Sequence, residues 1–117
     1  MRIGLRFIIM ACIALSFLSS CAKGDSYATA IVFEDLNGNG IIETDEKPIK
    51  GITINIKYRK LLDVAVTDEH GKIERFIPGA RCNAIELEMI VPKGYEPTTQ
   101  TKSAYCNALF GLQKKPN

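Results

Sequence analysis

The sequence predicts an all-β fold, a small β-sandwich, from two observations. Apolar and polar residues alternate in several short runs, and the clearest contains Ile52, Ile54, Ile56 and Tyr58. Residues spaced by two lie on one face of a strand, so each run indicates a strand with one buried face. Turn sequences rich in Gly and Pro separate the runs, and no segment keeps helical spacing over three turns. Short alternating strands with such turns are typical of a β-sandwich.

Five strands can be placed from the alternation. The first contains Ile31 and Phe33, and the last precedes the C-terminal tail. The strands are expected, in chain order, at 28–34, 52–59, 62–67, 85–91 and 108–113. The sequence shows no internal repeat and no low-complexity tract. We therefore expect one domain at 28–114, followed by a short tail at 115–117.

The first twenty residues have the features of an export signal. Arg2 and Arg6 supply positive charge, and residues 7–18 form an apolar run too short to span a bilayer. The run ends in Leu-Ser-Ser before Cys21, and small residues in front of a cysteine resemble the bacterial lipobox. We expect residues 1–20 to be a lipoprotein signal peptide that is removed. The alternative is an ordinary signal peptide followed by an incidental cysteine.

Cys21 would then begin the mature protein and carry the lipid. Several acyl chains on one residue anchor a protein stably, because each buried CH2 contributes about 0.8 kcal/mol. Residues 21–27 are short and polar, as expected for a tether between the bilayer and the domain. Ala22 stands where an Asp would suggest retention at an inner membrane. The predicted location is the cell envelope, at the outer membrane if the organism has one.

The mature chain is expected to have no net charge. Of the 15 basic residues, Arg2 and Arg6 leave with the signal peptide, so 13 remain against 13 acidic residues. The densest basic cluster is Lys57, Arg59 and Lys60, which we interpret as a solvated face and turn. This balance does not indicate binding of nucleic acid.

Two of the four cysteines remain once Cys12 has left with the signal peptide and Cys21 carries lipid. In an exported protein the remaining pair, Cys82 and Cys106, is most simply a disulfide. In the chain-entropy model it would stabilise the fold by about 3 kcal/mol. A free thiol pair, or a soft-metal site with His70 as a further ligand, is the alternative.

The segment from Asp35 to Glu46 carries oxygen-bearing side chains at the spacing of a calcium loop. Asp35, Asn37 and Asn39 occupy positions 1, 3 and 5, a glycine follows at position 6, and Glu46 stands at position 12. Ca2+ takes about 6–8 oxygen ligands from a loop that wraps around it. The candidate ligands are the side chains of Asp35, Asn37, Asn39, Glu43 and Glu46 and the carbonyl of Ile41. The alternative is a plain tight turn, since Asn and Gly tolerate positive φ.

Both flanks of this loop are predicted strands, whereas an EF-hand loop lies between two helices. We therefore expect an EF-like loop in a β protein, with a structural Ca2+ rather than a signalling one. Its three carboxylates and two amides predict a modest affinity, with dissociation constants of about 10^-4 to 10^-3 M as the apt comparison.

The order of motifs resembles the B-type repeat domain of serine-aspartate adhesins, within the Cna-B or prealbumin-like sandwiches. The matching segments are VFEDLNGNGIIETDEKPIKGITINI, VTDEHGKI, IPGA, VPKGYEPTT and LFGL. They run from about Thr29 to Leu112. The resemblance implies a seven-stranded prealbumin-like (Ig-like) β-sandwich, stiffened by calcium, that acts as a stalk or spacer. It also implies that the loop residues named above bind the metal, and it places Asp68 in a second turn motif.

Two features depart from the family pattern. The family alternates aromatics after the second turn, but Ile73 and Phe76 are three apart, which predicts a bulge or a shifted register. Cna-B relatives often form an internal Lys–Asn isopeptide bond, for which Asn107 is a candidate, but residues 28–34 contain no lysine. We therefore expect the disulfide, and not this crosslink, to staple the domain.

Little in the sequence points to catalysis. His70 is the single histidine and lies in a predicted turn, and no G-x-S-x-G motif occurs. A bound cation would also hold the loop carboxylates ionised. We expect a non-catalytic lipoprotein with a structural or adhesive role at the cell surface. The alternative is a binding or accessory module for a surface glycan or protein complex, with Tyr95 and Tyr105 as candidate contact residues.

Overall fold

The structure is a computed structural model and describes residues 26–116. The predicted signal peptide, the lipidation site Cys21 and most of the predicted tether lie outside the described residues. Within the described residues, no helix is both long enough and apolar enough to cross a membrane.

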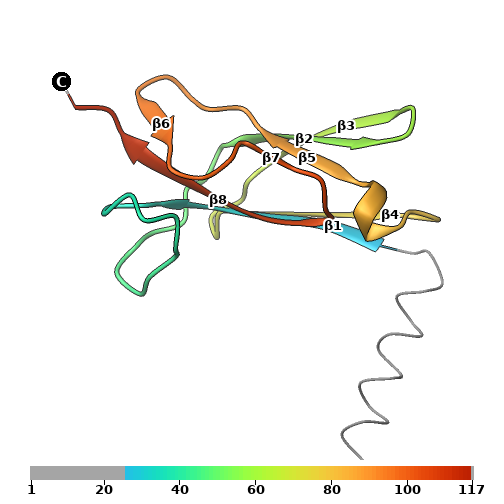
Figure 1. Cartoon of the computed structure of the whole chain (residues 1–117), viewed down its shortest axis with the longest axis horizontal. Coiled ribbons are helices and arrows are strands. Elements are labelled where there is room, and N and C mark those ends of the chain that lie inside the picture. Colours follow the sequence, from blue (N-terminus) through green and yellow to red (C-terminus); the bar gives the residue numbers. More distant parts are fainter. Residues whose placement is uncertain (1–25, 117) are drawn as a thin grey trace, which may run out of the picture.

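Two four-stranded sheets pack face to face, which confirms the predicted all-β sandwich (Figure 1). The first sheet contains, in spatial order, β4 (Lys72–Ile77), β1 (Ser26–Glu34), β8 (Asn107–Lys114) and β6 (Tyr95–Pro97). The second contains β3 (Leu61–Val66), β2 (Thr53–Tyr58), β5 (Glu86–Met89) and β7 (Lys102–Ser103). A single 3-10 turn, η1 (Cys82–Ala84), precedes β5. Neighbouring strands are antiparallel except β1 and β8, which are parallel.

The described residues form eight strands, not the predicted seven. The strands that the alternation did not locate include β6 and β7, which are only three and two residues long. Strands this short depend on backbone pairing to β8 and β5 and bury almost no face of their own, so they leave no alternation in the sequence. The first strand also begins at Ser26, two residues before the predicted start of the domain.

The core lies between the sheets and follows the alternation. Strand β1 directs small residues inward, whereas β2, β5 and β8 direct large ones. The members of the buried core cluster on these four strands are Ala28, Ala30, Val32, Ile54, Ile56, Leu87, Met89, Phe110 and Leu112. Each of the large side chains contributes about 1.5–3 kcal/mol when fully buried.

The bulge predicted in the segment around Ile73 and Phe76 is wrong. Strand β4 pairs with β1 without interruption, from Ser26 opposite Ile77 to Ile31 opposite Lys72. An odd separation places two residues on opposite faces of a regular strand. Ile73 therefore lies in the core, while Phe76 is exposed and packs against Tyr27, with ring centroids 5.1 Å apart.

The long axis of the sandwich separates two ends (Figure 1). At one end lie the start of β1, the β2–β3 hairpin and the segment that contains η1. At the other end lie the loop between β1 and β2 and the C-terminal part of β8. The predicted calcium loop is therefore far from the point at which the chain enters the domain.

Candidate functional site

The β1–β2 loop begins at the end of strand β1 and is pinned to the same strand where it returns. Where it returns, the amide of Glu34 donates to the carbonyl of Lys47 at 2.8 Å, and that of Ile49 donates to the carbonyl of Val32 at 3.0 Å. Pro48 bridges to Phe33, which is fully buried although it points away from the core face of β1. The loop thus closes on a fixed base, and its oxygen-bearing residues project from that base.

Asp35 is the first residue after β1 and is 0% exposed. Its amide donates to the carbonyl of Leu112 on β8 at 2.7 Å. Its Oδ2 accepts a hydrogen bond of 2.6 Å from the amide of Gly40, which has a φ of 76° suited to glycine. Its Oδ1 is buried and has no hydrogen-bond partner within the described residues. One oxygen therefore closes the loop and the other is left without a partner.

Glu46, at the far end of the loop, is also buried. Its Oε2 accepts from the amide of Leu36 at 2.7 Å, and its Oε1 accepts from the amide of Glu43 at 3.0 Å. Two loop amides thus converge on one carboxylate. The residues at positions 1 and 12 thus both accept hydrogen bonds from loop amides.

The exposed part of the loop is organised around Glu43. Its Oε1 accepts from the side-chain amides of Asn37 at 2.6 Å and Asn39 at 2.9 Å. The side-chain oxygen of Asn39 in turn accepts from the amide of Ile41 at 3.0 Å. The carbonyl of Ile41 accepts no hydrogen bond from the described residues. Positions 3, 5 and 9 are thus in mutual contact.

Hydrogen bonds, not a group of carboxylates, hold the loop in this structure. Among residues 26–116, no three His, Cys, Asp or Glu side chains lie together as a metal-binding group. The carboxylates of Asp35 and Glu46 bind loop amides, and that of Glu43 binds two asparagines. The oxygens at the predicted positions are gathered in one loop, but they are directed at loop donors.

Thr98, just after β6, is a neighbour of the site that the sequence did not predict. Its Oγ1 is buried and, like Asp35 Oδ1, has no hydrogen-bond partner in the described part of the chain. Both side chains border Gly111, where a Cβ would clash with Thr98 Oγ1 and lie 3.4 Å from Asp35 Cβ. No local signal marks this contact, because Thr98 and Asp35 are far apart in sequence.

The environment of Asp35 favours its ionised form. Burial alone would raise the pKa of Asp35, but hydrogen-bond donors around the carboxyl outweigh it and hold the pKa below its ordinary value. The Thr98 hydroxyl contributes most, although its geometry falls short of a hydrogen bond, and the amide of Gly40 follows. The site therefore has a buried negative charge that is compensated only in part, by the partial positive charges of hydrogen-bond donors.

The second turn motif, at 68–71, lies against the base of the loop through its glycine. The carboxylate of Asp68 accepts from the amides of His70 at 2.8 Å and Lys72 at 3.1 Å, within its own turn. These bonds, the one from Lys72 first, hold the pKa of Asp68 below its ordinary value. Gly71 packs on the backbone of Val32 and Ile49. Asp68 shapes this turn, and the structure shows no contact between its carboxylate and the candidate ligands.

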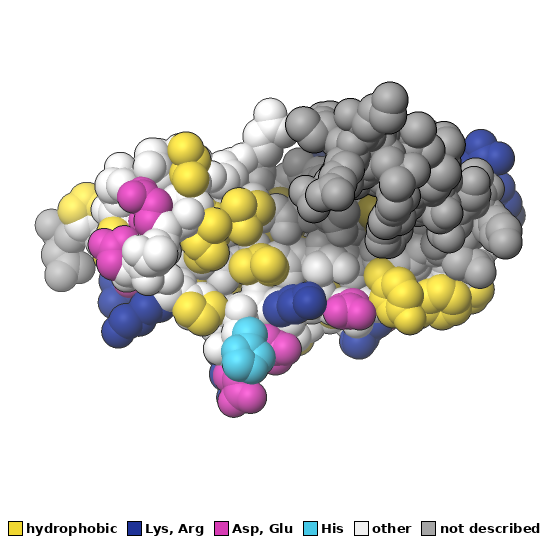
Figure 2. All heavy atoms as spheres, turned by 90° about the horizontal axis from the view of Figure 1, so that it is seen from below, with side chains coloured by type: hydrophobic (Ala, Val, Ile, Leu, Met, Phe, Trp, Pro, Cys, Tyr) yellow, Lys and Arg dark blue, Asp and Glu magenta, His cyan; other side chains and the backbone are white. Residues whose placement is uncertain are grey.

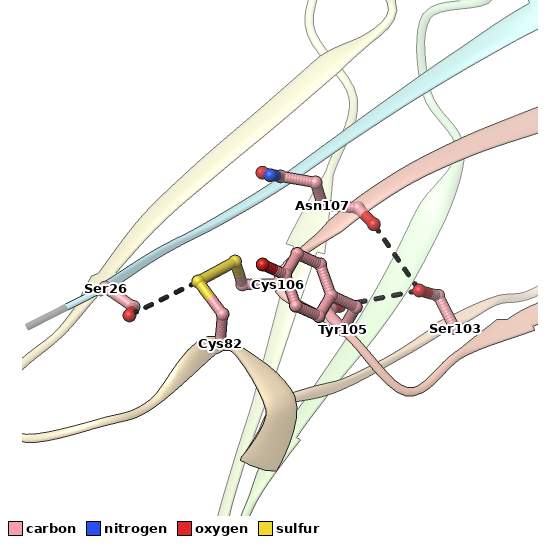
Figure 3. Close-up of a disulfide and its surroundings, with 6 residues drawn as sticks. All are labelled: Ser26, Cys82, Ser103, Tyr105, Cys106 and Asn107. Carbon is pink, nitrogen blue, oxygen red and sulfur yellow. Dashed lines mark hydrogen bonds between the residues drawn. A yellow bond between two sulfur atoms is a disulfide. The ribbon is translucent and has the colours of Figure 1, made fainter. Parts of the chain in front are cut away.

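The disulfide predicted between Cys82 and Cys106 is confirmed, with Cα atoms 4.6 Å apart (Figure 3). It joins η1 to the residue before β8, and the hydroxyl of Ser26 lies 3.5 Å from Cys82 Sγ. Asn107, the candidate for an isopeptide bond, is exposed and pairs in register with Thr29, not with a lysine. Tyr105 beside the disulfide is exposed, whereas Tyr95 on β6 packs in part against the core.

These features define a class of protein, a disulfide-stapled β-sandwich module with an oxygen-rich loop after its first strand. Solved structures of similar architecture are shaft pilins and minor pilins of Gram-positive bacteria. The shaft pilin SpaA from Lactobacillus rhamnosus GG has a TM-score of 0.53 and 12% identity, and the match covers 79% of this chain and 52% of that chain. The minor pilin GBS52 from Streptococcus agalactiae has a TM-score of 0.52 and 14% identity, and the match covers 80% of this chain and 46% of that chain. At these identities the likeness concerns the fold alone.

Sequence comparison identifies the family. The chain is 38% identical over 72 residues to Serine-aspartate repeat-containing protein D of Staphylococcus aureus (strain Newman). This match covers 60% of this chain and 5% of the relative. It is 37% identical over 86 residues to Serine-aspartate repeat-containing protein C of the same strain, and this match covers 69% of this chain and 9% of the relative. The SdrD B-like domain family matches residues 28–107. The chain belongs to this family, which confirms the resemblance, and it spans less than a tenth of these relatives' length.

Proposed function

We propose that this chain is a lipid-anchored module of the cell envelope whose β1–β2 loop binds a structural Ca2+ ion. Membership of the SdrD B-like domain family supports a structural or adhesive role at the cell surface. The lipid anchor is supported by the Leu-Ser-Ser sequence before Cys21. Calcium binding is supported by the spacing of the oxygen-bearing loop residues and by a buried oxygen of Asp35.

The observation that carries the calcium proposal is the buried Oδ1 of Asp35, which has no hydrogen-bond partner among residues 26–116. A buried carboxylate oxygen without a partner is costly, because it has lost its water and gained nothing in return. Asp35 occupies position 1 of the loop, and its carboxyl group is close enough to the side chains of Thr98 and Glu46 for both to lower its pKa. A cation bound there would supply the missing partner.

The donor set fits a hard cation. Asp35, Glu43 and Glu46 provide carboxylate oxygens, and Asn37 and Asn39 carry amide oxygens. The carbonyl of Ile41 accepts no hydrogen bond from the described part of the chain. These are oxygen ligands of the kind that Ca2+ prefers. The ion would neutralise the mutual repulsion of three carboxylates and tie the exposed part of the loop to its buried base. Because the carboxylates now accept from loop donors, binding would have to draw the loop oxygens together.

Thermal unfolding of the mature chain, with excess EDTA and then with 1 mM Ca2+, tests this proposal. For a dissociation constant of about 10^-4 M, saturation by mass action stabilises the fold by about 1.4 kcal/mol. In a domain of this size that corresponds to an increase in Tm of about 6–11 °C. Glu43→Gln should remove most of this increase and keep the apo fold, because Glu43 is exposed and Gln keeps an oxygen that can accept from Asn37 and Asn39.

Asp45 offers a matched control in the same loop. It is exposed, as Glu43 is, but it stands outside the ligand positions, so Asp45→Asn should keep the full response to Ca2+. Equal melting curves with and without Ca2+, together with no heat of binding by calorimetry, would reduce the segment to a hydrogen-bonded loop. The anchor is tested separately by the mass of the N-terminal peptide of the mature protein.

A second candidate function is the binding of a surface glycan or protein. The observation in its favour is a shallow, polar hollow of about 320 Å³ between the β7 region and β8. It is lined by residues that include Thr99, Gln100, Lys102, Ser103 and Asn107. Hydroxyl and amide groups of this kind suit a polar ligand. A glycan array probed with the Ca2+-loaded chain tests this function, and Ser103→Ala with Asn107→Ala should abolish any specific signal.

We propose no catalytic chemistry. His70 is exposed in the 68–71 turn, and its amide is bound to Asp68. The loop carboxylates are engaged as described above. Hydrolytic activity that is lost in His70→Ala would contradict this view.

A further inference from the structure

The end of the sandwich at which the chain enters is basic. The β2–β3 hairpin contributes Lys57, Arg59 and Lys60, and the segment before η1 contributes Arg81. All four side chains are exposed, and none forms an ion pair within residues 26–116. Two separate elements thus bring four free positive charges to one end of the domain.

The two elements are held side by side. The hydroxyl of Tyr58 in the hairpin donates to the carbonyl of Gly79 at 3.2 Å, just before Arg81. The guanidinium of Arg59 lies 5.4 Å from the centroid of the Tyr58 ring. Glu86 is the neighbouring acid, opposite Lys57 in the strand register. Asp63, the other acid of this region, is already paired with Arg75 at 3.1 Å.

Exposed aromatic side chains lie at the same end, on the outer face of the first sheet, whereas the basic hairpin belongs to the second sheet. Tyr27 is 54% exposed and Phe76 is 51% exposed, and their rings contact each other at the start of β1. Figure 2 shows hydrophobic side chains that gather toward the right-hand end of this face of the molecule. Phe76 lies on β4, whose last residue immediately precedes the segment that leads to Arg81. Aromatic and basic groups together are typical of surfaces that lie at a lipid headgroup region.

Arg59 occupies a conformation that favours glycine. Its φ is 54°, and it is the one non-glycine residue with positive φ among the described residues. Asn or Gly would fill this hairpin position at less conformational cost. A basic residue at a strained position points to a use for its charge outside the fold.

The length of the tether determines what this end can reach. Five residues lead from Cys21 to Ser26. A fully extended chain covers about 3.3–3.6 Å per residue, so the start of β1 lies within about 18 Å of the lipidated residue. We infer that the anchor end, defined as Tyr27, Lys57, Arg59, Lys60, Phe76 and Arg81, lies on an anionic lipid surface. This inference rests on the lipid anchor of the proposed function.

The opposite end carries charges of both signs. It holds the carboxylates of the β1–β2 loop and those of Asp68 and Glu69 in the second turn, together with Lys47, Lys50, Lys93, Lys114 and Lys115. Anionic lipid attracts basic residues and repels acidic ones over about one Debye length. The short tether and the unpaired basic residues of the anchor end therefore orient the domain with the calcium loop away from the bilayer.

Rates of lysine labelling test the orientation. The full, acylated chain is placed in vesicles of neutral phosphatidylcholine, or of phosphatidylcholine with 30% phosphatidylglycerol, and treated with a water-soluble amine reagent. Lys57 and Lys60 should be labelled about fivefold more slowly in the anionic vesicles, and 1 M NaCl should remove the difference. Lys93, Lys114 and Lys115, on the opposite part of the molecule, should be labelled equally in both.

Two matched double variants distinguish an effect of the anchor end from an effect of the total charge of the protein. Arg59→Gln with Arg81→Gln leaves both reporter lysines in place and removes two charges, so their protection should be lost. Each basic residue near an anionic surface contributes about fivefold to binding, so the pair should weaken the contact by about 25-fold. Lys93→Gln with Lys114→Gln removes the same charge from the opposite part of the molecule and should leave the protection unchanged.

Three outcomes would overturn the inference. Labelling of Lys57 and Lys60 could be equal in both kinds of vesicle, or protection could survive the arginine substitutions. Protection that depends on the ratio of protein to lipid and persists in detergent would show contact between copies of the chain. Mass spectrometry of the N-terminal peptide distinguishes failure of the docking surface from failure of the lipid anchor. An acylated chain without protection refutes only the docking surface, whereas an unmodified Cys21 refutes the anchor itself.

Discussion

Gly71→Ala is expected to destabilise the sandwich far more than a glycine substitution at an open turn. Gly71 is buried in the 68–71 turn at a φ of 68°. A Cβ at this position would clash with the carbonyl oxygen of Val32 and lie 2.8 Å from Pro48 Cβ and 3.1 Å from Ile49 N. Two of these three atoms belong to the backbone, so no side-chain rotation relieves the contact.

The expected loss of stability in Gly71→Ala has two contributions. An L-residue in the left-handed region loses about 1–2 kcal/mol relative to glycine. Overpacking of a well-packed site costs about a further 1–3 kcal/mol. The total of about 2–5 kcal/mol is a large part of the stability of a small domain and lowers Tm by at least about 8 °C.

Gly51→Ala separates the two contributions. Gly51 has a φ of 85°, but a Cβ there would meet no atom within 4 Å, so only the conformational cost of about 1–2 kcal/mol applies. The chain has no Trp, so far-UV circular dichroism during urea and thermal unfolding is the suitable measurement. Equal losses of stability in Gly71→Ala and Gly51→Ala would show that the turn moves away from Val32, and the packing argument would then be wrong.

Three further predictions concern the disulfide and two carboxylates. Replacing Cys82 and Cys106 with Ser should lower the free energy of unfolding by about 3.4 kcal/mol in urea, given the sequence separation of 24; a loss below about 1 kcal/mol would contradict the chain-entropy reasoning. Thr98→Val should raise the pKa of Asp35 in a carboxyl NMR titration, and Thr98→Ser should not; an unchanged pKa in both variants would show that the loop amides suffice. Because folding lowers the pKa of Asp68, its contribution is present above about pH 4 and is lost as pH falls through the folded value. Wild type should therefore exceed Asp68→Asn in stability at pH 6 but not at pH 2, and a gap that persists at pH 2 would refute the linkage.

The parts of the fold that could be predicted are those with a local cause. The alternation in 52–58 and 85–89 reflects one buried face, which is a property of each strand alone. The spacing in the β1–β2 loop likewise reflects one continuous turn of chain, and the carboxylates of Asp35 and Glu46 both bind amides of that turn. The number of strands was not predictable, because β6 and β7 exist through pairing with partners distant in sequence.

The sequence by itself determined the class of fold, the oxygen-rich loop and the pair of cysteines, since each depends on periodicity, on short spacing or on the count of a rare residue. Only the tertiary structure decided that Thr98 and Gly111 enclose Asp35, and that Gly71 supports the base of the loop. It also decided that the basic hairpin and Arg81 share an end with Tyr27 and Phe76. These contacts arise when two sheets close on a common core. Such closure joins residues that no local pattern relates.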